Sequence, residues 1–482
     1  MSDNYDAVIV GSGPNGLAAA ITLAMADLSV LVLEARETVG GGMRSAELTE
    51  SGFIHDICSA VHPLGAGSSF LSRLPLYNYG LEWIYPPIHA AHPLENEESA
   101  FLVQDICDTA ESLGKDSEAY IKIFKPQVEG WNKIAFDILG PARIPYYLPE
   151  AISFGIKAIQ SAKTFSTRYF SHKKARALFA GMAAHSILPL EKAITSAVAL
   201  VLMIQGHIQG WPIPKGGSQS IANAMQSYLQ SLGGKIQTEV EITDLSELPS
   251  SRAILFDLTP RQILDICKDK LPNSYRRSLS KYRYGPGAFK IDWALNDPIP
   301  FKSEENRKSG TIHLGGSFEE IAESENQVWK GKTSKNPFTI LSQPSLFDST
   351  RAPNGKHTAW AYCHVPHGSD FDMTDKIENQ IEKFAPGFKD TIIARHSKPP
   401  KALENYNANY IGGDINGGVQ DFRQLFFRPV LSLSPYRMPL KGYYICSSST
   451  PPGGGVHGMC GYHAACQAFK DVFDIEFDIR KV

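Results

Sequence analysis

The sequence predicts an α/β protein that opens with a strand–helix–strand unit and closes with a second strand–helix unit. Residues 7–10 are a β-branched run that suits a buried parallel strand, and residues 17–26 are rich in Ala and Leu, which suits a helix. Residues 29–33 form the expected second strand. Near the other end, residues 443–446 have the pattern of a strand, and a helix rich in small side chains follows residue 455.

The loop between the first strand and helix has the spacing of a dinucleotide-binding turn. Gly11 makes the tight turn, Gly13 lets the backbone approach a pyrophosphate, and Gly16 lets helix and strand pack closely. The helix N-terminus offers free N–H groups and a positive dipole end to phosphates. Glu34 ends the second strand, where it can hydrogen-bond ribose hydroxyls. An ordinary glycine turn is the alternative, and the flanking strand, helix and acid argue against it.

Composition describes a globular protein of two domains and excludes one class of partner. A chain of 482 residues with 43% apolar residues can bury a large core. Its 47 Lys and Arg residues do not exceed its 50 Asp and Glu residues, so no basic excess exists to neutralise nucleic-acid phosphates. The longest apolar stretches, 17–26 and 193–204, are too short to span a bilayer.

Cysteine usage and the start of the chain predict a cytoplasmic protein without a metal centre. The first strand begins a few residues after Met1, which leaves no room for a cleaved signal peptide. The cysteines show no CxxC pair and no metal-ligand spacing, so zinc and iron–sulfur chemistry are not expected. They are Cys58, Cys107, Cys267, Cys363, Cys446, Cys460 and Cys466.

A glycine cluster after the second strand indicates which dinucleotide is bound. Residues 36–44 carry an arginine at each end and three glycines between, which extend the phosphate-binding surface. They resemble the flavoprotein superfamily of amine oxidases and phytoene desaturases, in which this element contacts FAD. The redox cysteine pair of flavoprotein disulfide reductases does not occur between Gly42 and Ser51. No second strand–GxGxxG–helix unit is found for a nicotinamide dinucleotide, so one dinucleotide, FAD, is expected.

The C-terminal glycines, Gly453–Gly455, Gly458 and Gly461, predict a second contact with the cofactor. The N-terminus of the helix that follows would stabilise negative charge on a reduced flavin ring. The pattern resembles the C-terminal motif of the phytoene desaturase group, whose flavin pyrimidine side lies against this helix. A purely structural glycine turn is the alternative.

Further motifs extend the resemblance over most of the chain. Residues 214–218, 232–240 and 253–260 are similar to the superfamily's return to the FAD domain. Other motifs suggest a narrower group, the phytoene-dehydrogenase-related oxidoreductases: residues 284–295, 360–366, 406–414 and 428–429.

Two departures weaken any assignment of phytoene as substrate. Many desaturases have His-Pro where this chain has Pro451-Pro452, and Gly where it has Ser447.

The motifs and the resemblance together predict which residues hold FAD. The resemblance places adenine beside the backbone near Val240. The predicted cofactor residues are Gly11, Gly13, Pro14, Asn15, Gly16, Glu34, Ala35, Arg36, Gly41, Gly42, Met43, Arg44, Val240, Ser448, Gly455, Val456 and His457.

The positions of these motifs predict two discontinuous domains. A Rossmann-type FAD-binding domain takes residues 1–89, 213–280 and 426–482. An α+β substrate domain takes the stretches between them, with helices in residues 90–212 and a sheet in residues 281–425.

Hydride can pass to a flavin without a protein nucleophile, so the catalytic candidates are few. Lys290 is similar in placement to the amine oxidase lysine that holds a water near flavin N5; a lysine paired with Asp292 is the alternative. His457 is either a ring contact and proton relay or a hydrogen-bonded core histidine. His55, His185 and His364 are expected to be packed or capping residues.

Residues 140–176 combine aromatic and basic side chains. Tyr146, Tyr147, Leu148 and Phe154 could line a tunnel mouth or touch a membrane, although core packing is the favoured interpretation. The basic residues would suit lipid head groups or a solvated face: Lys163, Arg168, Lys173, Lys174 and Arg176.

The expected function is an FAD-dependent dehydrogenation or desaturation of an apolar, isoprenoid or carotenoid-like molecule by hydride transfer to flavin N5. Oxygen, a quinone or another carrier would reoxidise the flavin. One alternative is a flavin amine oxidase. Another is a non-catalytic prenyl-binding carrier, because Rab GDP-dissociation inhibitors share this fold ancestry without using FAD.

Overall fold

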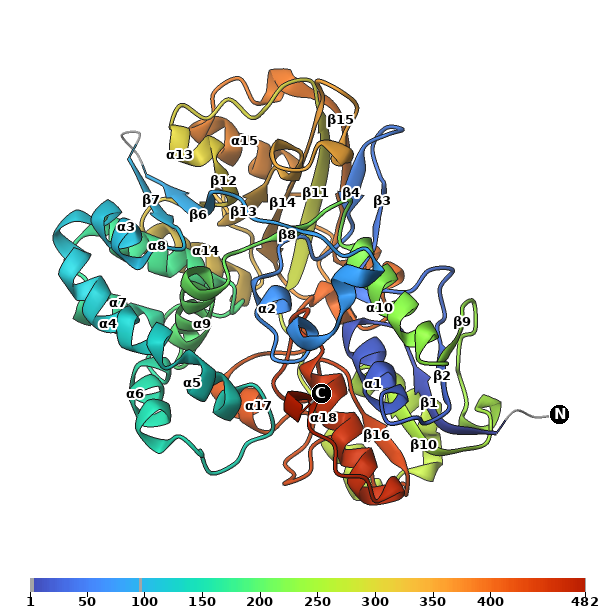
Figure 1. Ribbon diagram of the computed structural model, residues 1–482. Coiled ribbons are helices and arrows are strands. Elements are labelled where there is room, and N and C mark those ends of the chain that lie inside the picture. The colour runs from blue at the N-terminus through green and yellow to red at the C-terminus, as the bar shows by residue number, and fades with distance from the viewer. Residues whose placement is uncertain (1–3, 95–97, 482) are drawn as a thin grey trace.

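Two β-sheets and a group of helices make up the protein in a computed structural model (Figure 1). The structure describes residues 4–94 and 98–481. One sheet has five strands and lies near the N- and C-termini, and the other has seven strands. This arrangement confirms the predicted α/β fold class.

The five-stranded sheet is parallel and draws its strands from three separate parts of the chain. Its order is β16-β10-β1-β2-β9, and every pairing is parallel. These strands are β1 (Tyr5–Val10), β2 (Val30–Leu33), β9 (Lys235–Gln237), β10 (Ser251–Phe256) and β16 (Tyr443–Ile445).

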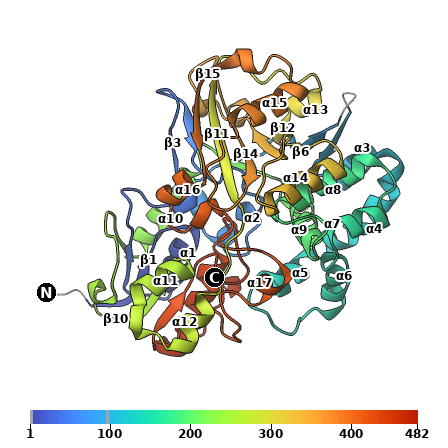
Figure 2. The same cartoon turned by 180° about the vertical axis from the view of Figure 1, so that it is seen from behind.

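Both faces of this sheet are covered by helices, which is why its strands are apolar throughout. Alternate residues such as Ala7 and Ile9 pack under three helices, whereas Val8 and Val10 pack against helices on the other face. Figure 2 shows that second face. The first three helices are α1 (Pro14–Ala24), α10 (Gln219–Ser231) and α18 (Met459–Ala468), and the others are α11 (Pro260–Cys267) and α12 (Asn273–Leu279).

The seven-stranded sheet has the order β15-β11-β14-β13-β12-β6-β7. It is antiparallel except for the pairing of β6 with β12. The expected boundary at residue 90 falls inside β6, so the N-terminal part also contributes to this sheet. The strands are β6 (Ile88–Pro93), β7 (Ser99–Leu102), β11 (Gly287–Leu295), β12 (Ser309–Leu314), β13 (Thr339–Ser342), β14 (His357–Val365) and β15 (Ile392–Lys398).

The two faces of this sheet differ in polarity. Ile291, Trp293 and Leu341 belong to an apolar core on one face, which α15 (Thr374–Phe384) covers with residues such as Ile377. The alternate residues face the other way and include Lys290 and His313, so charged and polar groups collect on the face toward the rest of the molecule.

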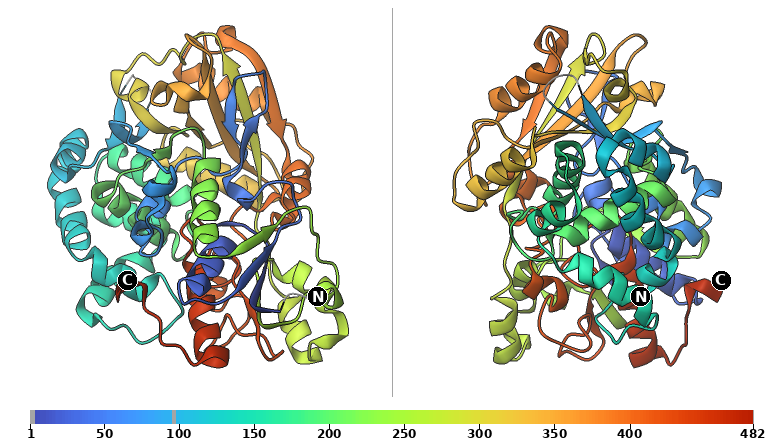
Figure 3. Two further views of the ribbon diagram at one scale, coloured as in Figure 1. Left: turned by 45° about the vertical axis from the view of Figure 1, so that its right-hand side comes forward. Right: turned by 90° about the vertical axis from the view of Figure 1, so that its left-hand side faces the viewer.

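Helices between residues 106 and 208 form a third body beside both sheets (Figure 3). The sequence predicts continuous helices over 118–138 and 150–169, but each is two helices, because a break falls at Gly130 and at residues 159–161. The helices are α3 (Ile106–Ser112), α4 (Ser117–Glu129), α5 (Trp131–Ile138), α6 (Leu148–Ala158), α7 (Ala162–Tyr169), α8 (Lys173–Ala184) and α9 (Thr195–Ile208).

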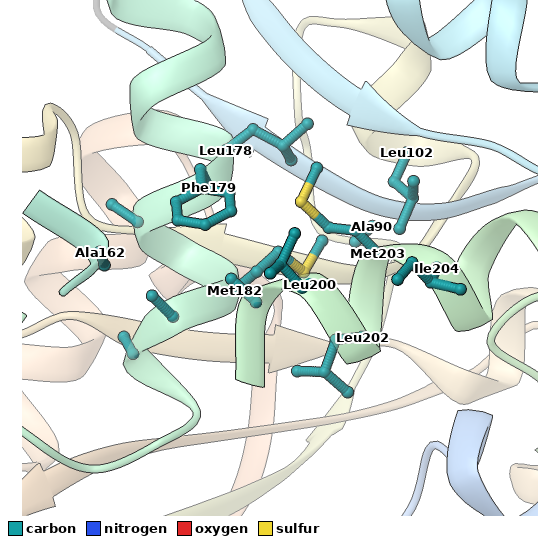
Figure 4. Packing of buried hydrophobic residues seen from close by; sticks show 14 of the residues in the cluster. Ala90, Leu102, Ala162, Leu178, Phe179, Met182, Leu200, Leu202, Met203 and Ile204 are labelled. Carbon is teal, nitrogen blue, oxygen red and sulfur yellow. The ribbon is translucent and has the colours of Figure 1, made fainter. Parts of the chain in front are cut away.

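Helices α8 and α9 lie side by side and carry the core of this body (Figure 4). Phe179, Met182, Leu200 and Met203 are buried between them and β6 and β7. The core fixes the end of α8 and the middle of α9 against the sheet.

Short elements connect these bodies. They are the hairpin β3 (Ser45–Glu47) and β4 (Ile54–Asp56), the pair β5 (Trp83–Ile84) and β8 (Ile213–Pro214), and the helices α2 (Pro63–Ala66), α13 (Glu304–Arg307), α14 (Phe318–Trp329), α16 (Pro400–Tyr406) and α17 (Phe422–Phe426). Across residues 4–94 and 98–481, none of the helices is both long and apolar enough to cross a membrane.

Candidate functional site

A cavity of about 430 Å³ runs from the glycine loop after β1 to the polar face of the seven-stranded sheet. This volume is in the range of small-molecule sites. One end is built from glycines and charged residues of the five-stranded sheet's loops. The other end is built from Trp, Tyr, His and aliphatic side chains.

Residues 11–15 line the first end, as the dinucleotide-binding turn requires. Gly11 has a φ of +98°, which favours glycine, and α1 begins directly after Gly13. Gly16 does not line the cavity. A Cβ at this position would lie 2.1 Å from the Gly11 carbonyl oxygen, so only glycine fits there. The loop therefore presents backbone and the N-terminus of α1 to the cavity.

Glu34 is buried at the end of β2 and holds the loop in place. Its carboxylate accepts hydrogen bonds from the Ser12 N–H (2.9 Å) and hydroxyl, and from the Arg36 N–H (2.9 Å). Arg44 adds a charged hydrogen bond at 3.1 Å. Glu34, Ala35, Arg36 and Arg44 line the cavity, whereas Met43 is fully buried in the core beneath α10.

Asp257 is a site residue that the motif search missed. It follows β10, and its carboxylate accepts a hydrogen bond from the Gly16 N–H at 2.9 Å. Burial, with a smaller contribution from the Glu34 carboxylate, raises the pKa of Asp257 to about 7. The signal was available, because β10 is parallel to β1 and the carboxyl ends of parallel strands meet at one edge.

Residues 406–410 cover the glycine cluster. The Tyr406 hydroxyl donates to the Gly41 carbonyl at 2.6 Å, and Asn409 Nδ2 donates to the Asp257 carbonyl at 2.9 Å. The Tyr410 hydroxyl packs against Gly42, where no side chain would fit. The sequence shows this motif as family resemblance only, because contacts between residues more than 150 positions apart leave no local pattern.

The C-terminal motif contributes backbone to the cavity and side chains to the core. Ser448, Gly455 and Val456 line the cavity, as does Val240 from the middle segment. His457 does not: its Nδ1 accepts the Met459 N–H at 3.0 Å, and its Nε2 lies 3.2 Å from the Gly453 carbonyl. Burial lowers the pKa of His457 to about 4, so the ring is neutral, and both of its nitrogens lie within hydrogen-bond distance of the chain.

Lys290 lies behind the cavity wall and does not line it. It forms a buried ion pair with Asp292 and stands 5.7 Å from the centre of the Trp360 ring, which does line the cavity. Burial raises the pKa of Asp292 to about 6 despite the lysine beside it, and burial lowers the pKa of His55 to about 3.

The second end of the cavity has an uncharged lining. Ala60, Val61, Leu202, Trp211 and Ile340 supply its apolar surface. Its polar groups come from His185, Thr311, Trp360 and Tyr362. The charged residues that line the cavity, Glu34, Arg36, Arg44, Glu241 and Asp257, belong to the loops of the five-stranded sheet.

The fold is of the α/β class and includes a Rossmann-like domain. Residues 9–73 match the model of the NAD(P)-binding Rossmann-like domain.

Relatives of this chain match it over nearly its whole length. Pyridine nucleotide-disulfide oxidoreductase domain-containing protein 2 of Rattus norvegicus is 24% identical, covering 98% of this chain and 94% of its own length. A lycopene-forming phytoene desaturase of a Paracoccus species is 21% identical, covering 94% and 95%. These matches confirm the predicted resemblance.

Solved structures show the same fold. An oxidoreductase from Methanosarcina mazei aligns with a TM-score of 0.65 at 14% identity, covering 96% of this chain and all of that one. Putrescine oxidase bound to putrescine aligns with a TM-score of 0.62 at 16% identity, covering 98% and 100%.

Asp257→Asn should change how stability depends on pH. An unfolded Asp releases its proton near its ordinary pKa of 3.8, and folded Asp257 near about 7. Between these values the folded state binds more protons, so the free energy of unfolding falls as pH rises. Urea unfolding of Asp257→Asn should lack this contribution, and Asp265→Asn, an exposed control on α11, should retain it. A variant profile parallel to that of the wild type would contradict the burial of a protonated Asp257.

Proposed function

We propose that the protein is an FAD-dependent oxidoreductase that dehydrogenates an apolar molecule of isoprenoid or carotenoid type. The observation that carries the proposal is the single cavity that joins a dinucleotide-binding loop to an uncharged, largely apolar chamber. The phytoene desaturases among the relatives support an apolar substrate.

The residues at the first end fit the cofactor. Gly41 approaches the Gly13 Cα so closely that a Cβ would stand 2.9 Å from it, which leaves backbone alone to face a pyrophosphate. Asn15 Oδ1 is buried at the cavity without a hydrogen-bond partner among the described residues. A polar ligand group would satisfy it.

FAD, when bound, supplies the hydride acceptor. The loop at residues 11–15 would hold the pyrophosphate, Glu34 the ribose, the backbone near Val240 the adenine, and Gly455 and Val456 the flavin. Asp257 in its protonated form adds no negative charge beside the phosphates. Tyr406 and Asn409 keep the loop segments together through their hydrogen bonds to the Gly41 and Asp257 carbonyls.

A flavin amine oxidase is the second candidate, and the aromatic side chains of Trp211, Trp360 and Tyr362 favour it. Against it, the uncharged end of the cavity has no carboxylate among its described lining residues to pair with an ammonium group. A non-catalytic prenyl-binding carrier would not require the glycine loop or Glu34. Because this chain has both, they argue against the carrier alternative.

Anaerobic reduction of the flavin separates these candidates. Carotenoids and other isoprenoids should bleach the flavin absorbance of the FAD-loaded protein, whereas primary amines should not. Readmission of oxygen, or addition of a quinone, identifies the acceptor. Bleaching by amines alone would replace the proposal with the amine oxidase, and no bleaching by any compound would overturn the proposed substrate class.

We propose that Lys290 is a positioning residue that orders water or protons near flavin N5 through its buried pair with Asp292. Lys290→Met should slow reoxidation of the reduced flavin by at least about tenfold, in the range of lost proton-transfer assistance, with FAD content unchanged. Lys330→Met, which changes an exposed lysine at the end of α14, is the control. Unchanged reduction and reoxidation rates would remove Lys290 from the site.

Exposed apolar side chains around α6 support peripheral membrane contact. Their exposure corrects the core packing that is expected for Tyr146 and Leu148. Phe154 is buried, but Tyr146 is 76% exposed and Leu148 is 53% exposed. The outward face of α6 continues the apolar surface, because α6 packs on α5 and α9 with its opposite face. The exposed residues of this surface are Ile144, Tyr146, Leu148, Ile152, Ile156 and Ile159.

We propose that this surface lies on anionic bilayers, with Lys163 and Arg168 near the head groups. Wild-type protein should co-sediment with phosphatidylserine-containing vesicles, and Ile152→Asp with Ile156→Asp should reduce the bound fraction several-fold. Ile393→Asp changes an exposed isoleucine on β15 and is the control. Equal sedimentation of all three proteins would contradict the proposal.

A further inference from the structure

The uncharged end of the cavity is walled by one face of the seven-stranded sheet. On this face, Trp360 and Tyr362 of β14 alternate with Ala359 and Ala361, which belong to the apolar core behind the sheet. Tyr362 is the register partner of Ile340 on β13, and Ile340 is the register partner of His313 on β12. Trp360, Tyr362, Ile340 and Thr311 therefore share the face that lines the cavity.

Among the residues of this face that line the cavity, two carry a polar atom without a hydrogen-bond partner in the described parts of the chain. Trp360 Nε1 and Thr311 Oγ1 are buried and unpaired among the described residues, and both side chains line the cavity. Trp360 is 6% exposed and Thr311 is 2% exposed. Buried polar groups are nearly always hydrogen-bonded, so two unpaired atoms beside one cavity indicate a partner that the ligand supplies.

The surrounding groups determine the charge of that partner. His185, at the end of α8, lines the cavity, and its Nε2 lies 2.9 Å from His313 Nε2. Burial lowers the pKa of His185 to about 3, so this imidazole is neutral. No acidic or cationic side chain shares this end of the cavity within the described parts of the chain.

The chemistry of the two atoms determines which ligand group fits. An indole N–H only donates, so Trp360 requires an acceptor, and a threonine hydroxyl can donate or accept. A hydrocarbon would leave both unpaired, and a carboxylate or ammonium would be buried without an opposite charge. An uncharged oxygen satisfies the site without either penalty.

We propose that the ligand of this chamber is an apolar molecule with at least one uncharged oxygen, a carbonyl or a hydroxyl, hydrogen-bonded by Trp360 Nε1 and Thr311 Oγ1. The inference rests on the proposed function for the chemistry that follows binding. Within the isoprenoid class, it favours an oxygenated molecule over a hydrocarbon of the same length.

The test compares three probes of equal chain length: geranylgeraniol, its aldehyde geranylgeranial, and the hydrocarbon in which hydrogen replaces the hydroxyl. Binding is measured by quenching of tryptophan fluorescence, with and without FAD. The aldehyde and alcohol should bind the wild type at least about tenfold more tightly than the hydrocarbon, the factor expected for one satisfied buried hydrogen bond.

Thr311→Val removes the hydroxyl at nearly constant shape, so it should reduce this preference while hydrocarbon binding is retained. Thr358→Val is the matched control, because Thr358 Oγ1 is also buried and unpaired on β14 but lies outside the cavity. Trp360→Phe is a second variant that removes the donor and keeps an aromatic ring, and it should also reduce the preference.

The outcomes separate this inference from the proposed function. Equal binding of all three probes, no binding of any probe, or equal effects of Thr311→Val and Thr358→Val would overturn the oxygen assignment. Failure to take up FAD with the oxygen preference retained would overturn the proposed function alone.

Discussion

The buried guanidinium of Arg351 joins the β3–β4 hairpin, the loop before α10 and the segment after β13. It is fully buried and pairs with Asp56 at 3.0 Å and with Asp348 at 2.9 Å. Asp56 lies on β4 and also accepts the Ser218 N–H at 2.6 Å, while Asp348 accepts the Gly216 N–H at 2.8 Å. Segments from three distant parts of the chain thus meet at one charge, which must stay paired because isolated buried charges are unstable.

Close packing of helices is the second constraint, and it explains the glycines at both ends of the chain. At Gly461, α18 lies against the Asn15 carbonyl of α1 with no space for a Cβ. Gly16 meets the Gly11 carbonyl in the same way. Gly16 and Gly461 allow this close packing but do not line the cavity, whereas Gly13 and Gly455 do. One glycine motif therefore serves both packing and ligand access.

Features that depend on local spacing could be predicted from the sequence. The strand, loop and helix around Gly11–Gly16 and the position of Glu34 follow from short-range pattern, and the structure has them within a few residues of the predicted bounds. The sheet expected within residues 281–425 is also present, because the alternation along β11 and β14 is a local pattern.

Features that depend on distant contacts could not be predicted. The raised pKa of Asp257 comes from burial beneath the loop, and His457 is held by hydrogen bonds to Gly453 and Met459. The sequence favours core packing for Tyr146 and Leu148, but both are exposed, because helical periodicity shows that a face is apolar without showing what covers it. The polar face of the seven-stranded sheet could not be predicted either, because it depends on the register between distant strands.

The cofactor content of the purified protein tests directly whether the chain binds FAD. The purified protein should be yellow, or colourless and able to take up FAD, and should release about one FAD per chain on denaturation. Gly13→Val should abolish uptake, because its side chain would meet the Asp257 carboxylate and fill the pyrophosphate approach. A folded wild-type protein that shows no flavin absorbance and binds no added FAD would contradict the account.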